Sequence, residues 1–309
     1  MIFELTILGC SSAIPIHNRF MSSQVLNVHG RLFLIDCAEG TQIRLAEYKI
    51  SKNKIENILI SHLHGDHIFG LPGLIGSMSM LGRTKPLDVY GPEGIESFLN
   101  NAFEISESFI GFELNIHVVR HSKYTKIIEN EKVIVYSFPL KHRIAAVGYK
   151  IVEKDRLRNI NPEMIEKYNL SYNQIQAAKY GNDINLTGGE VLKNADLTFS
   201  PKRKRSFAYC SDTIYDESIV PVVKKVDLLY HEATYMEHLK DKAKERFHST
   251  TVDAAKIAQQ AEVGKLIIGH YSSRYKDLNA LLQEAKGVFE RTELAIDGKR
   301  FTVKIPDNE

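Results

Sequence analysis

The chain has 309 residues, of which 43% are hydrophobic and 25% are charged, so it is long enough for one large domain or two small ones with a substantial core. Its 40 lysines and arginines nearly balance 38 aspartates and glutamates, and the net charge of +2 excludes a polycation. Any binding of nucleic acid would therefore come from local patches. No stretch approaches the roughly 20 apolar residues that span a bilayer, which excludes a membrane-spanning helix.

The first half of the chain is expected to be rich in β-strands, with helices between them. Alternating apolar residues predict a strand over 3–9 and a hairpin formed by 24–30 and 31–37. Further along this half, the pattern predicts a helix over 39–48, a helix that ends at 81 and a helix over 93–103. It also predicts strands over 58–60, 87–92, 114–119 and 133–138.

Four metal-binding side chains lie within six positions, directly after the apolar strand 58–60: His62, His64, Asp66 and His67. A loop between a buried strand and a helix can turn all four toward one point. Histidine and aspartate suit zinc or another borderline divalent metal such as Mn²⁺. Four ligands exceed what one open zinc site needs, so we expect two metals. His62 and His64 would hold one, and Asp66 and His67 the other.

The second half continues with strands that carry further candidate ligands. The expected strands are 145–152, 206–212, 226–231 and 266–270, and the expected helices are 250–260 and 278–290. His142, Asp212 and His270 each lie at or just beyond the C-terminal end of an apolar strand, and such ends converge on one edge of a sheet or sandwich. Asp212 is the natural bridging ligand, because a carboxylate has two oxygens. His142 would complete the first site and His270 the second.

The metal motif Ser-His-Leu-His-Gly-Asp-His at 61–67 resembles the signature of the metallo-β-lactamase superfamily. Other motifs resemble the ribonuclease Z family, the tRNA 3′-processing endonucleases. They are Leu-Gly-Cys-Ser-Ser-Ala-Ile-Pro at 8–15 with Arg19, Ser22 and Ser23, Asp-Cys-Ala-Glu-Gly-Thr-Gln at 36–42, His-Glu-Ala-Thr at 231–234, His-Ser-Thr at 248–250 and His-Tyr-Ser-Ser-Arg-Tyr at 270–275. The resemblance covers residues 3 to about 303. One departure is Ser211, where the family usually has glycine.

This resemblance implies an α/β (α+β) metallo-β-lactamase fold, a four-layer αβ/βα sandwich with a dinuclear site at one edge. It also implies a zinc-dependent endoribonuclease that removes the 3′ trailer from precursor tRNA and leaves a 3′-hydroxyl on the tRNA. Two Zn²⁺ per subunit and a homodimer come with the family.

Phosphodiester hydrolysis needs a nucleophile, charge neutralisation and a proton for the leaving group. Asp66 can orient or deprotonate the attacking water while it contacts a metal. His248 has no place in the metal shell, and we interpret it as a contact of the scissile phosphate or as an aid to the leaving 3′-oxygen. The alternative for His248 is a structural neighbour of the following helix.

Four more residues receive supporting roles. His231 and Glu232 would hold ligand imidazoles in one tautomer. Ser272 and Arg274 would bind substrate phosphate, since arginine offers a bidentate fork. The remaining histidines lack such context and are interpreted as structural or surface residues: His17, His29, His117, His121 and His238.

Residues 153–196 are polar, lack a strand period and contain helix-like segments at 162–168 and 172–179. These features predict an insertion that projects from the body. The resemblance implies that it is a tRNA-binding arm, an exosite, inserted into one metallo-β-lactamase domain made of 1–152 and 197–309. The family's arm often has a Gly-Pro-rich tip, which this chain lacks. The run Lys202-Arg203-Lys204-Arg205 alone favours a solvated loop, but beside an RNA-processing site it becomes a candidate phosphate contact.

Cysteine usage favours a reducing compartment. The three cysteines are an odd number at wide spacing, and no Cys-x-x-Cys pair occurs. The first residues lack the basic and apolar regions of a signal peptide. We therefore expect a cytoplasmic protein with no membrane partner.

Two alternatives remain open at this stage. The metal ligands alone would also suit a hydrolase of a thioester, a lactone or a small phosphodiester. A non-catalytic RNA-binding module is the other, although an intact set of ligands argues against it. A comparison of turnover on a tRNA precursor and on a glutathione thioester distinguishes the tRNA endonuclease from the other hydrolases. The metal content of the purified protein distinguishes it from a non-catalytic RNA-binding module.

Overall fold

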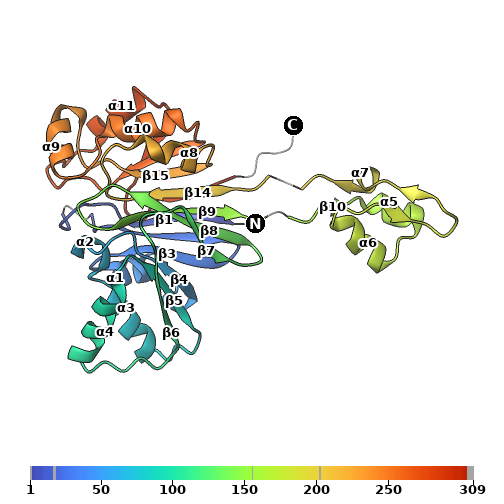
Figure 1. The fold of residues 1–309 in the computed structure, drawn as a ribbon, viewed down its shortest axis with the longest axis horizontal. Helices are drawn as coiled ribbons and strands as arrows, with labels where there is room; N and C mark the ends of the chain where they lie inside the picture. The colour runs from blue at the N-terminus through green and yellow to red at the C-terminus, as the bar shows by residue number, and fades with distance from the viewer. Residues whose placement is uncertain (1, 17–18, 155, 202, 305–309) are drawn as a thin grey trace. The chain divides into compact units, whose positions relative to one another are not determined.

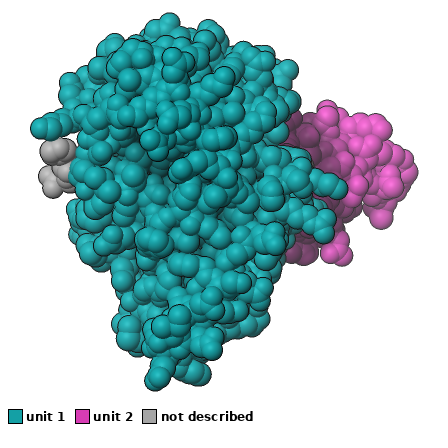
Figure 2. All heavy atoms as spheres, turned by 60° about the vertical axis from the view of Figure 1, so that its left-hand side comes forward, with its two compact units in different colours: residues 1–152, 205–304 teal, residues 153–204, 305–309 magenta. Residues whose placement is uncertain are grey.

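The computed structural model describes residues 2–16, 19–154, 156–201 and 203–304, and these divide into two compact units. Unit 1 contains the residues up to 152 and from 205 to 304, drawn in teal in Figure 2, and unit 2 contains the residues from 153 to 204, drawn in magenta. Among the described residues, no helix has both the length and the apolar character needed to cross a bilayer. His17 and Lys202 lie outside the described residues.

Two mixed sheets, each with seven described strands, form the centre of unit 1 (Figure 1). The first sheet has the order β18 (Arg300–Thr302), β1 (Phe3–Gly9), β2 (Ser23–Val28), β3 (Arg31–Cys37), β4 (Ile55–Leu59), β5 (Leu87–Gly91), β6 (Leu114–Val118). The second has the order β17 (Thr292–Leu294), β16 (Lys265–Gly269), β15 (Leu228–Glu232), β14 (Ser206–Cys210), β9 (Ala146–Glu153), β8 (Val133–Leu140), β7 (Thr125–Glu129).

The first sheet is buried on both faces, because successive side chains of a strand point to opposite sides. In β3, Phe33 and Ile35 join the apolar cluster that the two sheets share. Leu32 and Leu34 of the same strand join a second cluster, formed with the helices on the outer face. This explains why β3 is an almost continuous apolar run rather than an alternating one.

Helices cover the outer face of each sheet, which gives unit 1 four layers (Figure 1). The first sheet is covered by α1 (Thr41–Glu47), α3 (Leu71–Met80) and α4 (Ile95–Ile105). The second is covered by α8 (Val220–Val223), α10 (Thr251–Gln260) and α11 (Asn279–Lys286). This arrangement confirms the expected α/β fold with four layers. Two short helices, α2 (Gly65–Ile68) and α9 (Lys240–Glu245), complete the α-helices of the described part of unit 1.

Several elements differ from the sequence-based expectation. The metal motif is not wholly a loop, since α2 begins within it at Gly65. The last helix ends at Lys286 rather than near 290. Strands β7, β17 and β18 and helices α8 and α9 were not expected, because each is short or lacks a clear apolar period.

Unit 2 has an apolar core of its own, formed by Leu170, Ala178, Ile184, Leu192 and Leu197. Its elements are β10 (Asn159–Ile160) paired with β13 (Thr198–Phe199), β11 (Ile184–Asn185) paired with β12 (Val191–Leu192), and the helices α5 (Pro162–Tyr168), α6 (Tyr172–Lys179) and α7 (Asn194–Leu197). Helices α5 and α6 confirm the two helical segments expected here.

The chain leaves unit 1 from one strand and returns to it in the neighbouring strand. Val152 of β9 is paired with Ser206 of β14 in antiparallel register. Arg205, the last residue of the basic run, is buried in unit 1, where its guanidinium lies over the Phe3 ring at 5.2 Å and donates to the carbonyl oxygen of Val303 at 2.9 Å. Arg205 is therefore a structural residue and does not serve as an exposed phosphate contact.

Candidate metal centre

The predicted ligands follow the C-terminal ends of four strands from both sheets. His62 and His64 follow β4, His142 follows β8, Asp212 follows β14 and His270 follows β16. Asp66 and His67 lie in α2, which continues the loop after β4. The structure brings these side chains into two groups that share one edge of the sandwich, and a third group joins Asp212 and His270 to His248.

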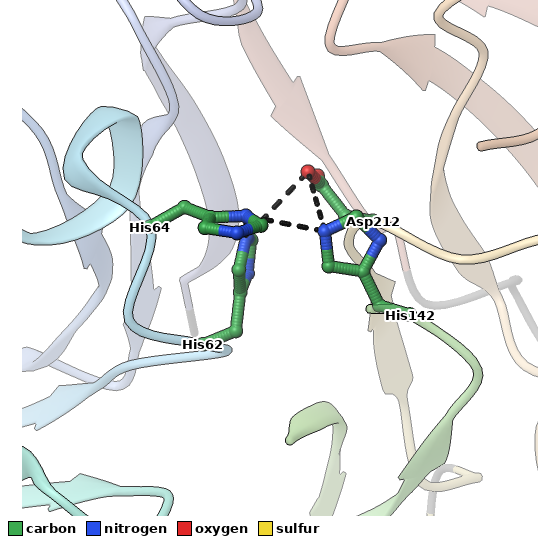
Figure 3. Close-up of side chains that lie close together, drawn as sticks. All are labelled: His62, His64, His142 and Asp212. Carbon is green, nitrogen blue, oxygen red and sulfur yellow. Dashed lines mark hydrogen bonds and ion pairs between the residues drawn. The ribbon is translucent and has the colours of Figure 1, made fainter. Parts of the chain in front are cut away.

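The first group contains His62, His64, His142 and Asp212 (Figure 3). His64 Nδ1 lies 3.1 Å from His62 Nε2 and 3.1 Å from His142 Nε2, so three ring nitrogens converge. Burial lowers the pKa of all three imidazoles below its usual value. They are therefore neutral, which is the form of histidine that binds metal.

In the first group, the tautomers of His62 and His142 follow from the hydrogen-bond partners of Nδ1, the ring nitrogen that faces away from the group. His142 Nδ1 donates to the carbonyl oxygen of Phe247 at 2.9 Å. Ser61 Oγ donates to Asp36 at 2.9 Å and accepts from His62 Nδ1 at 3.0 Å. Both rings therefore direct the lone pair of Nε2 toward His64, and lone pairs gathered this closely repel one another unless a cation lies between them. The donor set fits a divalent metal.

The second group contains Asp66, His67 and His270. Asp66 Oδ2 lies 3.7 Å from His67 Nε2 and 3.5 Å from His270 Nε2, and the two Nε2 atoms are 3.3 Å apart. His67 Nδ1 donates to Asp36 at 2.8 Å, and His270 Nδ1 donates to Thr234 Oγ1 at 2.9 Å. Both rings therefore direct Nε2 toward Asp66 and Asp212, the position in which a second cation would be held.

Asp212 lies between the two groups. Its Oδ2 is 3.5 Å from His62 Nε2 and 3.9 Å from His142 Nε2. Its Oδ1 is 3.5 Å from His67 Nε2 and 3.2 Å from His270 Nε2. One oxygen therefore faces each group, the arrangement that a bridging carboxylate requires.

Carboxylates dominate the electrostatics of the second group. Burial lowers the pKa of His67, but the neighbouring carboxylates, first Asp212 and then Asp66, outweigh burial and raise it to about 10. Burial raises the pKa of Asp66, but the charge of His67 outweighs that effect and keeps it well below its usual value. A metal cation here would take the place of the proton on His67, because metal binding and protonation compete for one lone pair.

Glu232 is fully buried and fixes His248 beside the metal groups. Its Oε1 accepts from His248 Nδ1 at 2.9 Å and from the backbone N–H groups of Thr213 and Ser249, each at 3.1 Å. Its Oε2 accepts from the N–H and hydroxyl of Thr234 at 3.0 and 2.7 Å. Burial lowers the pKa of His248, but the charge and hydrogen bond of Glu232 outweigh it and raise the pKa to about 9. His248 therefore carries a proton at neutral pH.

The other three sequence candidates make different contacts. His231 donates through Nδ1 to the carbonyl oxygen of Glu232 at 2.7 Å, and its Nε2 is a buried atom without a hydrogen-bond partner in the described part of the chain. Ser272 lines the cavity of the metal centre. Arg274 is exposed, donates to Ser272 Oγ at 3.0 Å and lies over the ring of Tyr235 at 5.1 Å.

A cleft of about 550 Å³ opens over the metal groups. Besides the candidate ligands and His248, it is lined by Ser12, Ala13, Ile14, Pro15, Met21, Glu39, Gly65, Phe69, Arg143, Thr234, Tyr235, Ser272 and Ser273. A cleft with metal ligands at its base and both apolar and basic side chains around it can admit a phosphodiester together with the groups attached to it.

Sequence reasoning missed the residues that orient the ligands from outside. Asp36 is the most connected, because its Oδ2 accepts from His67, from Ser61 and from the Tyr209 hydroxyl at 2.6 Å. Asp36 lies at the end of an apolar strand, like the ligands, and that position could have identified it. Thr234 lies in the His-Glu-Ala-Thr motif but received no role there, and the carbonyl of Phe247 carried no sequence signal.

Curated relatives resemble the chain over nearly its full length. Ribonuclease Z of Porphyromonas gingivalis is 45% identical over 299 residues, which cover 97% of this chain and 98% of that protein. Ribonuclease Z of Cytophaga hutchinsonii is 41% identical over 304 residues, which cover 98% of this chain and 97% of that protein. A family model described as anti-Pycsar protein Apyc1 matches residues 3–143.

Solved structures resemble the chain as well. The short form of human tRNase Z aligns with a TM-score of 0.72 at 27% identity, covering 98% of this chain and all of that chain. The metallo-β-lactamase fold protein YhfI of Bacillus subtilis aligns with a TM-score of 0.70 at 17% identity, covering 98% of this chain and 100% of that chain, and that likeness bears on the fold alone.

Proposed function

The chain belongs to the ribonuclease Z family and is an endoribonuclease of tRNA 3′ processing, and we propose that its cleft cuts the phosphodiester with two divalent metals held by the two ligand groups. The observation that carries this proposal is Asp212, which presents one oxygen to each group. Zn²⁺ fits the histidine-rich donor set, and Mn²⁺ is the other candidate.

His62, His64 and His142 would hold the first metal, and Asp66, His67 and His270 the second, with Asp212 shared. Metals bound there supply a more acidic water and neutralise charge on the phosphate. The chain's own contribution is to fix every imidazole through its outer nitrogen, so that the ligands need no rearrangement when substrate enters.

Asp66 accepts the proton of the attacking water. Its pKa is held well below the usual value, and its Oδ2 is fixed by the backbone N–H of Ala13 at 2.7 Å. A carboxylate that is ionised and fixed can orient a water molecule and take its proton as the new bond to phosphorus forms.

His248 donates a proton to the leaving 3′-oxygen. Glu232 holds its Nδ1 proton, which leaves Nε2 for the substrate in a residue that lines the cleft. In the protein without metal, the charge and hydrogen bond of Glu232 raise the pKa of His248, which is the direction that favours a general acid. Breaking the P–O3′ bond leaves a hydroxyl on the tRNA and a phosphate on the trailer. Ser272, with Arg143 and Arg274 near the cleft, is available to contact the phosphate backbone.

Unit 2 binds the body of the tRNA while its 3′ end enters the cleft. Unit 2 has its own core, so it can present a surface without taking part in the chemistry. Structured RNA is recognised mainly through its shape and its phosphates. Exposed side chains on this unit, including Tyr172 of α6 and Tyr180 directly after it, are available for that contact.

The active form is a homodimer in the cytoplasm. Helices α1 and α3 are joined by a hydrogen bond from Ser77 to Gln42, and they expose Ile43 and Met80, the latter 83% exposed. A Cβ at Gly76 of α3 would meet open space, so another helix could approach closely. Met80→Asp should shift the sedimentation of the protein from dimer to monomer, and a monomeric wild type would overturn this assignment.

The three free cysteines agree with a reducing compartment.

The test is cleavage of an end-labelled tRNA precursor, with metal analysis of the same preparation. We expect one cut at the tRNA 3′ end, products with a 3′-hydroxyl and a 5′-phosphate, and about two divalent ions per chain from the ligand count. Cleavage with one ion or none bound would overturn the two-metal proposal. Faster turnover of a glutathione thioester than of the precursor would favour the alternative hydrolase.

A further inference from the structure

The exposed aromatic ring of Phe69 lines the metal cleft and has no part in the chemistry described above. Phe69 is 67% exposed and lines the cleft, so its ring is accessible to a ligand that enters there. Its ring lies directly on Gly65, because a Cβ at that position would overlap the ring carbon Cε2. The backbone N–H of Phe69 donates to the carbonyl oxygen of Gly65 at 3.0 Å, which places Phe69 one helical turn after Gly65.

Phe69 belongs to an apolar wall of the cleft that comes from the first sheet and its loops. The N–H of Ala13 donates to Asp66, and the two residues after Ala13 also line the cleft. Ile14 is 52% exposed and Pro15 is exposed as well. This wall therefore offers a ring and two apolar side chains beside the carboxylate that accepts the proton of water.

Other lining residues come from the second sheet and have a different chemistry. Tyr235 and His248 are neighbours, with ring centroids 6.1 Å apart, and Glu232 fixes His248 from beneath. Ser272 lies on the same side, since its N–H donates to the carbonyl oxygen of Thr234. This second wall is polar, holds the proton donor and is organised by buried hydrogen bonds.

We propose that the ring of Phe69 stacks on the base of the first trailer nucleotide, a subsite that rests on the roles proposed for Asp66 and His248. The water oxygen bonds to phosphorus as its proton passes to Asp66. The P–O3′ bond breaks, and its electron pair stays on the 3′-oxygen, which takes a proton from His248. Attacking and leaving oxygens lie roughly in line across phosphorus.

This geometry assigns the two nucleosides that flank the cut to different walls. The leaving 3′-oxygen belongs to the last nucleoside of the tRNA, which therefore stays with the wall of His248. The first trailer nucleotide therefore lies against the wall that contains Phe69. Stacking on an aromatic ring tolerates any base, because every base has a flat face. That tolerance suits a substrate whose trailer sequence varies from one precursor to another.

The experiment combines enzyme variants with modified substrates. Wild type and Phe69→Ala are assayed on a precursor with all bases present, on one with an abasic first trailer nucleotide, and on one with an abasic last tRNA nucleotide. On the intact precursor, Phe69→Ala should lower kcat/KM roughly 5- to 150-fold, the range for stacking of one base on one ring. On the precursor with an abasic trailer nucleotide, the two enzymes should differ little. With the abasic nucleotide on the tRNA side, the full loss should remain.

Two further variants separate stacking from general damage. Phe69→Leu keeps an apolar side chain and should show most of the loss, whereas Phe69→Tyr keeps a ring and should restore the rate. Tyr124→Ala, which removes a half-exposed ring from outside the cleft, is the matched control and should cut normally. Metal content and thermal midpoint should match wild type in all variants. An equal loss on all three substrates, or a loss that disappears only with the abasic tRNA nucleotide, would overturn the proposal. Failure of wild type to cut any precursor would instead defeat the function itself.

Discussion

The two compact units differ in how firmly they fix their polar side chains. In unit 1, Asp36 and Glu232 are completely buried, and each accepts several hydrogen bonds that orient a histidine of the cleft. In unit 2, the apolar core is small, and large side chains such as Tyr172 and Tyr180 are at least 70% exposed. Chemistry at phosphorus needs groups held within fractions of an ångström, whereas contact with the outside of a folded RNA needs only a surface of suitable shape and charge.

The hydrogen bonds within unit 2 serve its own fold. Asn194 donates to the carbonyl oxygens of Ala178 and Asn182, and Ser171 forms a capping box with Gln174 at the start of α6. These contacts stabilise a small unit and leave its outer surface available. From this comparison we propose that cutting and binding are separate in this chain, and the following experiments test that separation.

The largest effect is expected from Asp212→Ala. This change removes the one carboxylate that faces both ligand groups, so both metals should be lost and cleavage should fall below detection. Metal analysis and single-turnover cleavage measure the two losses. His270→Ala is the matched comparison, since it removes a ligand of the second group alone and should leave the first metal bound. Retention of two ions by Asp212→Ala would refute the shared ligand.

His248→Ala should keep both metals and lose on the order of 10²–10⁴ in the cleavage rate, the usual scale for a general acid or base. Binding of the precursor should change much less, because we propose that unit 2 binds the tRNA body. The single-turnover rate and the dissociation constant separate these effects. A variant that loses metal together with the rate would place His248 in the metal shell instead.

Asp36→Asn should weaken metal binding by roughly 10- to 100-fold, the typical cost of losing a group that orients a ligand. The amide cannot accept all the hydrogen bonds that Asp36 now accepts from His67, Ser61 and Tyr209. Titration of the metal-free protein measures the loss, and saturating metal should restore most of the cleavage rate. Unchanged metal affinity would show that Asp36 serves the fold alone.

Leu197→Ala tests unit 2 from within. Leu197 is completely buried in the core of this unit, so its truncation should destabilise unit 2 by about 2–5 kcal/mol. Proteolysis should then cut within 153–204 sooner, and the precursor should bind more weakly, while the metal content stays at the wild-type level. A loss of metal from this variant would show that the two units depend on each other.

The clustering of the candidate ligands could be predicted from the sequence because these residues obey one local rule. Each of His142, Asp212 and His270 follows a strand of apolar residues, and the position of a residue relative to a strand end is readable without the fold. The four layers of unit 1 were predicted from the resemblance of whole motifs to a known family. The strands β17 and β18 have only three residues each, too few to show a period.

The partners of the ligands could not be predicted, because they lie far away in the sequence. His142 is held by the carbonyl oxygen of Phe247, 105 positions later, and any residue type supplies a carbonyl. Arg205 belonged to a basic run and was interpreted as a loop residue, although its side chain is buried over Phe3. Charge patterns describe composition, and only the packing shows that Arg205 is buried while Arg203 and Lys204 are exposed.

The most direct test of this division of labour replaces residues 154–204 with a short Gly-Ser linker. Val152 and Ser206 are paired across neighbouring strands, so the linker closes a hairpin and leaves the buried Arg205 in place. The variant and wild type are compared on a small chromogenic phosphodiester and on a tRNA precursor. The account predicts that hydrolysis of the small diester persists with two metals bound, while cleavage of the precursor falls sharply through weaker binding with a shallower dependence on salt. Normal binding and cutting of the precursor by this variant would contradict the account.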